Sequence, residues 1–204
     1  MKNQITTLLV LITFAANATI NTTVKIETLV CLPYHMMSDW NQLRYNLAVS
    51  IRSVHGNLKM YDNYCKVLNC ESDGWTNARN PKSSASGLFQ CMKSTFEEMR
   101  KRQGVKITFA QFRNLPLKEQ AKYFDEYLRL YPNKLAVINP NSDQVTRQVY
   151  AYLMVLKPSG VGKLWNDAVF KRGQGDYVPN KGIPHSNGVI TVKNIYQFCK
   201  RRFQ

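Results

Sequence analysis

Apolar residues recur at helical spacing in one segment after another of this chain of 204 residues. In KMYDNYCKVLNC, the side chains of Tyr61, Tyr64, Cys65 and Leu68 stand at positions i, i+3, i+4 and i+7, which is one face of a helix. Apolar stripes or helix-end signals mark further helices at 38–56, 94–104, 116–130, 142–157 and 191–202. The chain therefore predicts a mainly helical fold, in which amphipathic helices bury their apolar faces against one another.

Helix-end residues predict the bounds of the first helix. Ser38 or Asp39 can cap its N-terminus, and Gly56 can end it. Its apolar stripe consists of Leu43, Leu47, Ile51 and Val54. His55 stands in the last turn, where we expect it to contribute a favourable positive charge rather than to act as a catalyst.

The later helices carry similar signals. The spacing of residues 94–97, Ser-Thr-Phe-Glu, is that of a capping box with Ser94 at the cap, which makes Glu97 a structural partner of that cap. Pro116 fits the first turn of the next helix, Ser142 caps the one after it, and Pro158 ends that one. The last helix is expected to turn three apolar side chains inward: Ile195, Phe198 and Cys199.

Composition indicates a single folded domain with an anionic partner. Hydrophobic residues make up 44% of the chain, which is enough for a packed core and argues against disorder. The chain has 28 Lys and Arg against 13 Asp and Glu, a net charge of +15, which favours a polyanionic partner or surface. Nucleic acid, anionic lipid and the bacterial cell wall all fit that charge. The sequence has no Walker loop, dinucleotide-binding glycine pattern, zinc-ligand spacing or repeat.

The N-terminus reads as a secretory signal. Lys2 gives a positive start, residues 5–15 are mostly apolar, and residues 16–18 form an A-x-A-like cleavage site. The apolar run is short for a membrane span, although an uncleaved anchor is the alternative. We therefore expect a signal peptide at 1–18, an N-terminal connector at 19–37 and a folded domain at 38–204. Export predicts a secreted, periplasmic or virion-associated protein.

A single acid, Glu71, stands where the helix over 61–71 is expected to end, just before a turn-rich loop at 72–86. The backbone at a helix C-terminus carries partial negative charge, which together with partial burial is expected to raise the pKa of Glu71. A carboxyl that stays protonated near neutral pH can give its proton to a leaving oxygen, as glycosidic cleavage requires. The alternative is an ordinary surface glutamate at a frayed helix end.

Short motifs follow one another from this acid onward: Glu71-Ser72, Asn80-Pro81, Ser84-Ala85-Ser86 and Gly87-Leu88-Phe89-Gln90. Together they resemble the catalytic segment of the lysozyme-like lytic transglycosylases, most closely the phage-type and secreted members. The resemblance is dense over 61–92 and 150–196, thin between these segments and absent before residue 38. It implies a single, mainly α (α+β) lysozyme-like domain with a short loop or β-hairpin after the catalytic helix.

The same resemblance assigns roles to individual residues. It makes Glu71 the catalytic acid and expects Ser72 to steady it. The turn is expected to line the sugar-binding cleft through Ser86, Gly87, Leu88, Phe89 and Gln90, with the Gly87 backbone and the Gln90 side chain contacting the sugar.

A second segment with the resemblance is YLMVLKPSGVG at 152–162. It implies an aromatic side chain that faces the catalytic acid, which we assign to Tyr152 with Tyr150 as the substitute. A buried core tyrosine is the alternative. Relatives can carry a calcium-like loop near the C-terminus, but this chain has no carboxylate at 185–187 and has Asn194 where a bidentate glutamate would be needed. We therefore predict no metal and no cofactor.

Two further features near Glu71 leave alternatives open. Asp73 could act as a second acid, although Asp73-Gly74 is a common turn dipeptide. The five cysteines and the expected export permit disulfides. Because the resemblance brings Cys70 and Cys91 near each other, a disulfide between them is one hypothesis, and two small buried hydrophobes are the other.

These observations predict a peptidoglycan lytic transglycosylase that cleaves the MurNAc-GlcNAc β-1,4 bond with one glutamate and forms a 1,6-anhydro-MurNAc end. Its partners would be peptidoglycan glycan strands at the cell-wall surface, with no nucleic acid, and it would act as a monomer. The alternatives are a hydrolytic muramidase that uses the same Glu71, and a non-catalytic cationic protein that binds walls or nucleic acid through charge alone.

Overall fold

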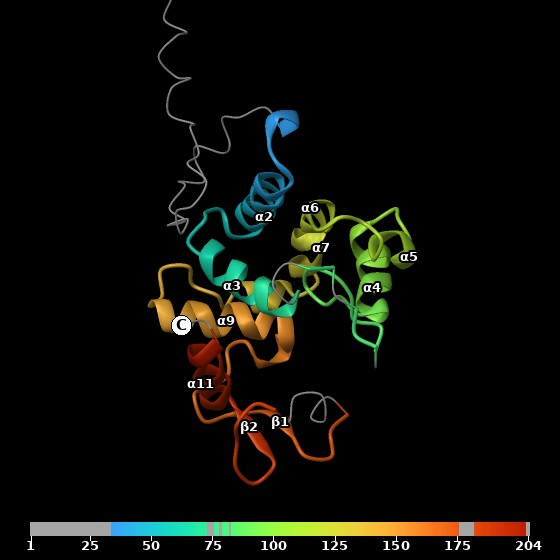
Figure 1. The fold of residues 1–204 in the computed structure, drawn as a ribbon. Helices are drawn as coiled ribbons and strands as arrows, with labels where there is room; N and C mark the ends of the chain where they lie inside the picture. The colour runs from blue at the N-terminus through green and yellow to red at the C-terminus, as the bar shows by residue number, and fades with distance from the viewer. Residues whose placement is uncertain (1–33, 73–75, 78, 82, 176–181, 203–204) are drawn as a thin grey trace, which may run out of the picture.

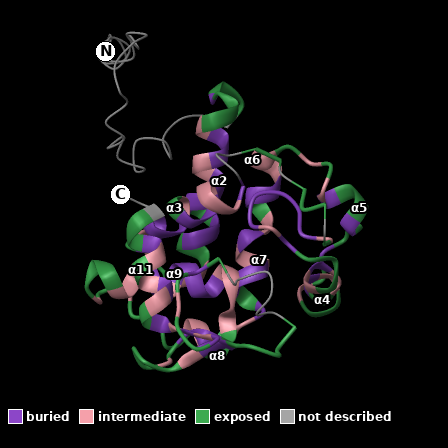
Figure 2. Cartoon of the chain, turned by 60° about the horizontal axis from the view of Figure 1, so that its bottom comes forward, coloured by how far each residue is buried: buried purple, intermediate pink, exposed green. Residues whose placement is uncertain are grey.

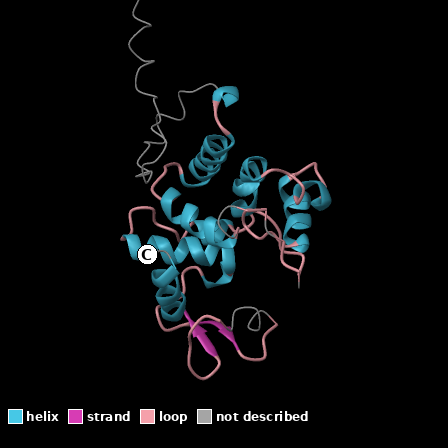
Figure 3. Cartoon of the chain, in the orientation of Figure 1, coloured by secondary structure: helices cyan, strands magenta, loops and turns pink. Residues whose placement is uncertain are grey.

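The computed structural model describes residues 34–72, 76–77, 79–81, 83–175 and 182–202 (Figure 1). The predicted signal peptide and most of the predicted connector lie outside these ranges. In chain order the elements are η1 (Tyr34–Met36), α2 (Asp39–His55), α3 (Tyr61–Glu71), α4 (Lys93–Gln103), α5 (Phe109–Phe112), α6 (Leu117–Gln120), η2 (Ala121–Tyr123), α7 (Phe124–Arg129), α8 (Pro132–Leu135), α9 (Gln144–Leu156), η3 (Pro158–Gly160), β1 (Ala168–Lys171), β2 (Val189–Thr191) and α11 (Val192–Arg202). Within these ranges the protein is mostly helical, as predicted, and it also has a two-stranded sheet (Figure 3).

Helix α2 has the bounds that its caps predict. The Ser38 side chain accepts a hydrogen bond from the Asn41 amide at 3.4 Å, and Gly56 closes the helix in the left-handed region at φ 70°. The expected positive charge at its end is wrong, however. Burial lowers the pKa of His55 to about 4, so this ring is neutral at pH 7, and its Nε2 lies 3.2 Å from the Tyr64 hydroxyl. His55 therefore joins α2 to α3 through a neutral hydrogen bond.

Helix α4 corrects the predicted capping box. Its N-cap is Met92, without a side-chain cap, and Glu97 instead pairs with Arg100 at 2.8 Å. The segment has the spacing of a capping box, but the chain enters the helix two residues earlier than that motif requires. A complete capping box stands at α5, where the side chains of Thr108 and Gln111 each accept from the other's amide, at 3.2 and 2.7 Å.

The helix predicted from Pro116 is divided in the structure into α6, η2 and α7. These three pieces nevertheless turn apolar side chains inward, since Ala121, Phe124 and Leu128 are fully buried. Helix α9 begins one residue later than expected: Asp143, not Ser142, caps it by accepting from the Thr146 amide at 3.0 Å. The predicted stop before Pro158 is confirmed, because α9 ends at Leu156.

The sheet lies near the C-terminus rather than after α3. Strands β1 and β2 pair antiparallel, with Phe170 opposite Ile190 and an irregularity in register between Ala168 and Phe170. Between α3 and α4, the described residues form only isolated bridges, Arg79 with Ser86 and Ser86 with Cys91. In the described part of the chain, the segment after α3 is thus a loop closed by bridges.

The helices are arranged around α3 and α9, which pack against each other near the middle of the molecule (Figure 1). Helix α2 packs on α6, η2 and α7, and α11 packs on α9. Buried residues gather on the facing sides of these helices, whereas α4 and α5 stand at one edge with exposed outer faces (Figure 2). Among the described residues, no helix is long and apolar enough to cross a membrane.

Candidate functional site

Glu71 is the last residue of α3, as the sequence predicts. Its apolar helix face is anchored by Tyr64 and Leu68, both fully buried, so the position of the helix end is set by the core. The Glu71 side chain is half-buried. The acid therefore stands at the negative end of α3 and at the boundary between core and solvent, and its role as a proton donor stays a prediction.

Ser72 fixes the exit from this helix. It is the C-cap, is fully buried, and its amide donates to the Leu68 carbonyl at 2.9 Å. Its own carbonyl accepts from the amide and the hydroxyl of Thr76, at 2.8 and 2.7 Å. Ser72 thus positions the start of the loop beside Glu71. The next residue, Asp73, for which a second acid and a turn residue were the alternatives, lies outside the described residues.

The motif at 86–91 folds into a tight turn. The backbones of Ser86 and Cys91 exchange two hydrogen bonds, at 3.2 and 3.0 Å, which close the loop formed by residues 87–90. Gly87 and Gln90 both have positive φ, 73° and 46°. The turn is held further by the Gln90 side-chain amide, which donates to the Gly87 carbonyl at 3.1 Å. Gln90 is half-buried, and the other five residues of the 86–91 turn are buried.

The buried side of the turn rests on Gln120, a residue that sequence reasoning missed. The Gln120 side chain is fully buried and accepts from the Leu88 amide at 2.8 Å. It also donates to the Asn77 side chain at 3.1 Å and to the Leu115 carbonyl at 2.9 Å. A Cβ on Gly87 would lie 2.0 Å from the Gln120 Oε1, so only glycine fits there. A glutamine within a predicted amphipathic helix gives no signal of such a role.

Leu88 and Phe89 point into the core rather than toward a ligand. Leu88 is fully buried and Phe89 is 2% exposed. The Phe89 ring packs against three others, Phe112, Phe124 and Tyr127, at centroid distances of 5.6, 5.5 and 5.1 Å. In the structure these two side chains anchor the turn, so its exposed part, with Gln90 at the end, is what remains to contact a sugar.

Tyr127 packs against the turn through Phe89 and is hydrogen-bonded to α9, the helix that packs on α3. Its hydroxyl donates to the carbonyls of Met154 and Val155 on α9, at 2.9 and 3.0 Å. Burial raises the pKa of Tyr127 well above its usual value, and nearby acidic groups, among them Cys91 and Glu71, raise it further. Glu71 and Cys91, the closing residue of the turn, therefore both act electrostatically on one buried phenol.

Tyr152 lies in the middle of α9 and is buried, 3% exposed. Its ring packs against Phe198 of α11 at a centroid distance of 6.1 Å, which agrees with the alternative of a core tyrosine. Tyr150, the substitute, is half-buried on the same helix. Helix α9 packs directly against α3. A contact between an aromatic side chain of α9 and Glu71 stays a prediction.

The proposed disulfide is not formed in the structure. Cys70 and Cys91 are not bonded to each other, and neither Cys65 nor Cys199, the other described cysteines, is in a disulfide. The Cys91 side chain is buried beside the turn, where its thiol donates to the Met92 carbonyl at 3.6 Å. Burial raises the pKa of Cys91 to about 12. The alternative of a small buried hydrophobe therefore describes Cys91.

Within the described part of the chain, no three His, Cys, Asp or Glu side chains gather as metal ligands would. Near the C-terminus, Asn194 stands where the calcium-like loop of the resembled family would need a glutamate. Its side chain accepts hydrogen bonds from the Thr191 amide and hydroxyl, at 2.9 and 2.8 Å. These bonds cap α11, since the Thr191 hydroxyl accepts in return from the Asn194 amide at 3.3 Å.

No protein-family model, no curated protein and no solved structure matches the chain.

Proposed function

We propose that the protein is a lysozyme-like peptidoglycan lytic transglycosylase with Glu71 as its catalytic acid and base. The observation that carries this proposal is the half-buried position of Glu71 at the C-terminus of α3, followed along the chain by the bridged 86–91 turn. The sequence motifs of that family span the same two elements. The net charge of +15 suits an enzyme that works on an anionic wall.

In this mechanism the protonated Glu71 carboxyl donates its proton to the glycosidic oxygen between MurNAc and GlcNAc, and the bond from that oxygen to the anomeric carbon breaks. The N-acetyl group of the substrate stabilises the positive charge that develops at this carbon. The Glu71 carboxylate then takes the proton of the muramoyl O6 hydroxyl, and O6 attacks the anomeric carbon to close the 1,6-anhydro ring. No water is consumed, and one glutamate performs both proton transfers, unlike the usual glycosidase pair.

The experiment is digestion of purified peptidoglycan by the wild-type protein and by Glu71→Gln, which keeps the shape of the side chain and removes its acid. We expect Glu71→Gln to lose activity by at least about 100-fold. Glu98→Gln is the matched control, because Glu98 is an exposed residue that pairs with Arg102 at 2.9 Å on α4. Equal activity of Glu71→Gln and the wild type would reject the catalytic role of Glu71, and the absence of digestion by either protein would favour a cationic binding protein.

Mass analysis of the released fragments separates the lyase from the hydrolase. Anhydro-muramoyl ends are the expected product, because they form when O6 attacks. Reducing muramoyl ends would show that water attacks instead, which would make the protein a muramidase with the same acid.

A further inference from the structure

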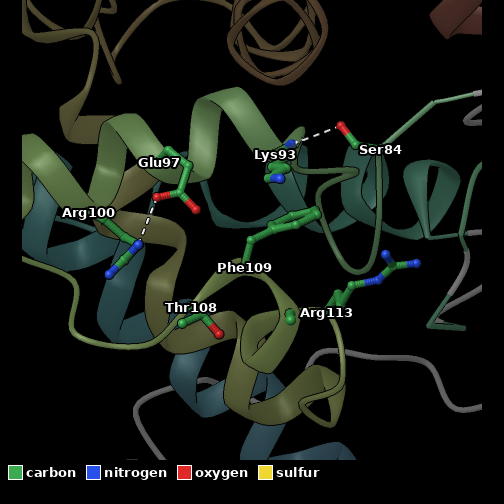
Figure 4. A pocket seen from close by; sticks show the side chains of 8 residues that line it. Ser84, Lys93, Glu97, Arg100, Thr108, Phe109 and Arg113 are labelled. Carbon is green, nitrogen blue, oxygen red and sulfur yellow. Dashed lines mark hydrogen bonds and ion pairs between the residues drawn. The ribbon is translucent and has the colours of Figure 1, made fainter.

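A pocket of about 400 Å³ lies between α4 and α5, at the edge of the molecule (Figure 4). Helix α4 contributes Lys93, Glu97 and Arg100 to its wall. Phe109 and Arg113, at the two ends of α5, form the opposite wall. The volume is within the range of small-molecule sites and is too small for a glycan strand of several sugars. We call this feature the α4–α5 pocket.

The α4–α5 pocket carries excess positive charge. Glu97 pairs with Arg100 at 2.8 Å, so these two charges compensate each other. Among the ion pairs of the described residues, neither Lys93 nor Arg113 has a partner. Two uncompensated cations across one small pocket favour an anionic ligand group.

The guanidinium groups leave donors to spare. The Nε atoms of Arg100 and Arg113 are buried and have no hydrogen-bond partner among the described residues. Buried N–H groups are nearly always hydrogen-bonded, and a carboxylate is the acceptor that a guanidinium prefers. Phe109 also lines the pocket and supplies an apolar surface beside these donors. The Arg113 guanidinium lies 5.9 Å from the centroid of its ring.

The pocket is continuous with the base of the 86–91 turn. The Ser84 hydroxyl, on the pocket wall, accepts from the Lys93 amide at 3.0 Å. The Ser86 hydroxyl donates to the Ser84 carbonyl at 3.1 Å. The segment that leads into the turn and the helix that follows it are thus fastened together at the pocket. A ligand held there is attached to the same rigid unit that presents Gln90.

We propose that the α4–α5 pocket binds a free carboxylate of the peptide stems of peptidoglycan, through Arg113 and Lys93 with Phe109 as the apolar contact. This inference rests on the proposed function, since it identifies the peptide-bearing form of that substrate as the preferred one. The stem is a short peptide with free carboxylates, so it supplies both the charge and the small apolar groups that the pocket receives. Strands without stems would bind through the sugar site alone.

Cleavage kinetics test the inference on two substrates: peptidoglycan with its stems, and the same material stripped of stems by an amidase. Arg113→Gln and Lys93→Gln are each expected to slow cleavage of the stem-bearing substrate about tenfold, through a raised KM, and to leave the stripped substrate unchanged. Lys101→Gln is the matched control, because Lys101 is an exposed α4 residue outside the pocket. Equal effects of all three variants on both substrates would overturn the proposal.

Direct binding separates this inference from the proposed function. The probe is the free tripeptide L-alanyl-γ-D-glutamyl-meso-diaminopimelate, titrated calorimetrically, with its fully amidated form as the control. We expect the free acid to bind the wild type, with about tenfold weaker binding to Lys93→Gln, an exposed position where folding is not at risk, and no binding of the amide. If the protein binds the peptide but cleaves no peptidoglycan, the pocket stands and the proposed function fails. If it cleaves peptidoglycan but does not bind the peptide, the pocket assignment fails alone.

Discussion

The rings of Phe89 and Tyr127 lie with their centroids 5.1 Å apart, one from the turn and the other from α7. Tyr127 in turn donates to two carbonyls of α9 and lies within electrostatic range of Glu71. This one contact therefore connects the turn to α7 and, through the Tyr127 hydroxyl, to α9. It implies that the position of the turn depends on the core and not only on the loop that precedes it.

Gly87→Ala is expected to destabilise the protein by about 2–4 kcal/mol. The new methyl would meet Gln120 Oε1 at 2.0 Å, and alanine would also be strained at a φ of 73°. Gly104→Ala is the matched control, because Gly104 has the same φ of 73° but nothing within 4 Å of a Cβ, so it should cost only about 1 kcal/mol. Urea unfolding measures both. Equal losses would show that the Gln120 contact does not constrain Gly87.

Gln120→Leu should cost about 2–4 kcal/mol of stability and slow peptidoglycan cleavage. The substitution keeps the volume but leaves the buried Leu88 amide and the Leu115 carbonyl without their partner. Gln144→Leu, at an exposed site, serves as the comparison and should change stability by no more than about 0.5 kcal/mol. If Gln120→Leu unfolded at the wild-type urea midpoint, the turn would not depend on this side chain.

His55 should lower stability at acid pH. Burial lowers its pKa to about 4 in the folded protein, whereas the unfolded chain binds the proton with a pKa near 6.5. Between these values the unfolded state holds more protons, so the free energy of unfolding rises with pH from about 4 to 6.5. After allowance for solvent, we expect about 1–2 kcal/mol. Thermal melts of His55→Gln should lack this rise, and a parallel pH profile in wild type and variant would contradict the assignment.

Glu126 should act in the opposite direction at higher pH. Burial, followed by the neighbouring Asp125 carboxyl, raises the pKa of Glu126 to about 8. The folded state then holds a proton that the unfolded state loses near pH 4.5, so stability falls as pH rises from about 4.5 to 8. The carboxyl is only half-buried, so a loss of about 1–2 kcal/mol is expected. Denaturation of Glu126→Gln across this range should be flat where the wild type declines.

The thiols of Cys65 and Cys91 should resist alkylation. Cys65 and Cys91 both have their pKa raised to about 12 by burial, so almost no thiolate is present at pH 8. We expect iodoacetamide to leave both unmodified in the native protein at pH 8 and to label both in urea without a reductant. Labelling that appears only after reduction would reveal a disulfide that the structure does not contain.

The sequence predicted those parts of the fold that depend on local patterns. Helix α2 has the predicted cap and the predicted glycine stop, and α3 ends at Glu71, as its apolar stripe and the turn-rich loop after it predicted. The errors occurred where a local motif competed with tertiary packing. Helix α4 begins after Met92, directly behind the bridged turn, and not at the capping-box spacing of 94–97. His55 lacks the expected charge because it is buried against Tyr64.

The candidate site was predictable only in part, for the same reason. The Glu-Ser pair and the Gly-Leu-Phe-Gln motif are contiguous in the chain and therefore visible. Gln120 and Tyr127 support them from helices farther along, and a glutamine or tyrosine in an amphipathic helix has no local pattern that distinguishes such a role. The roles of Leu88 and Phe89 also depend on depth in the core, which a motif does not encode.

The hydrogen bond from the Leu88 amide to Gln120 spans 32 positions of the chain. A segment of residues 61–92, transplanted into another helical scaffold, would carry the candidate acid and the motif but not the glutamine that holds the turn in shape. Such a chimaera should regain the native conformation of the loop only if the host supplies an equivalent amide at the same place, so the smallest portable unit of this protein extends at least to Gln120.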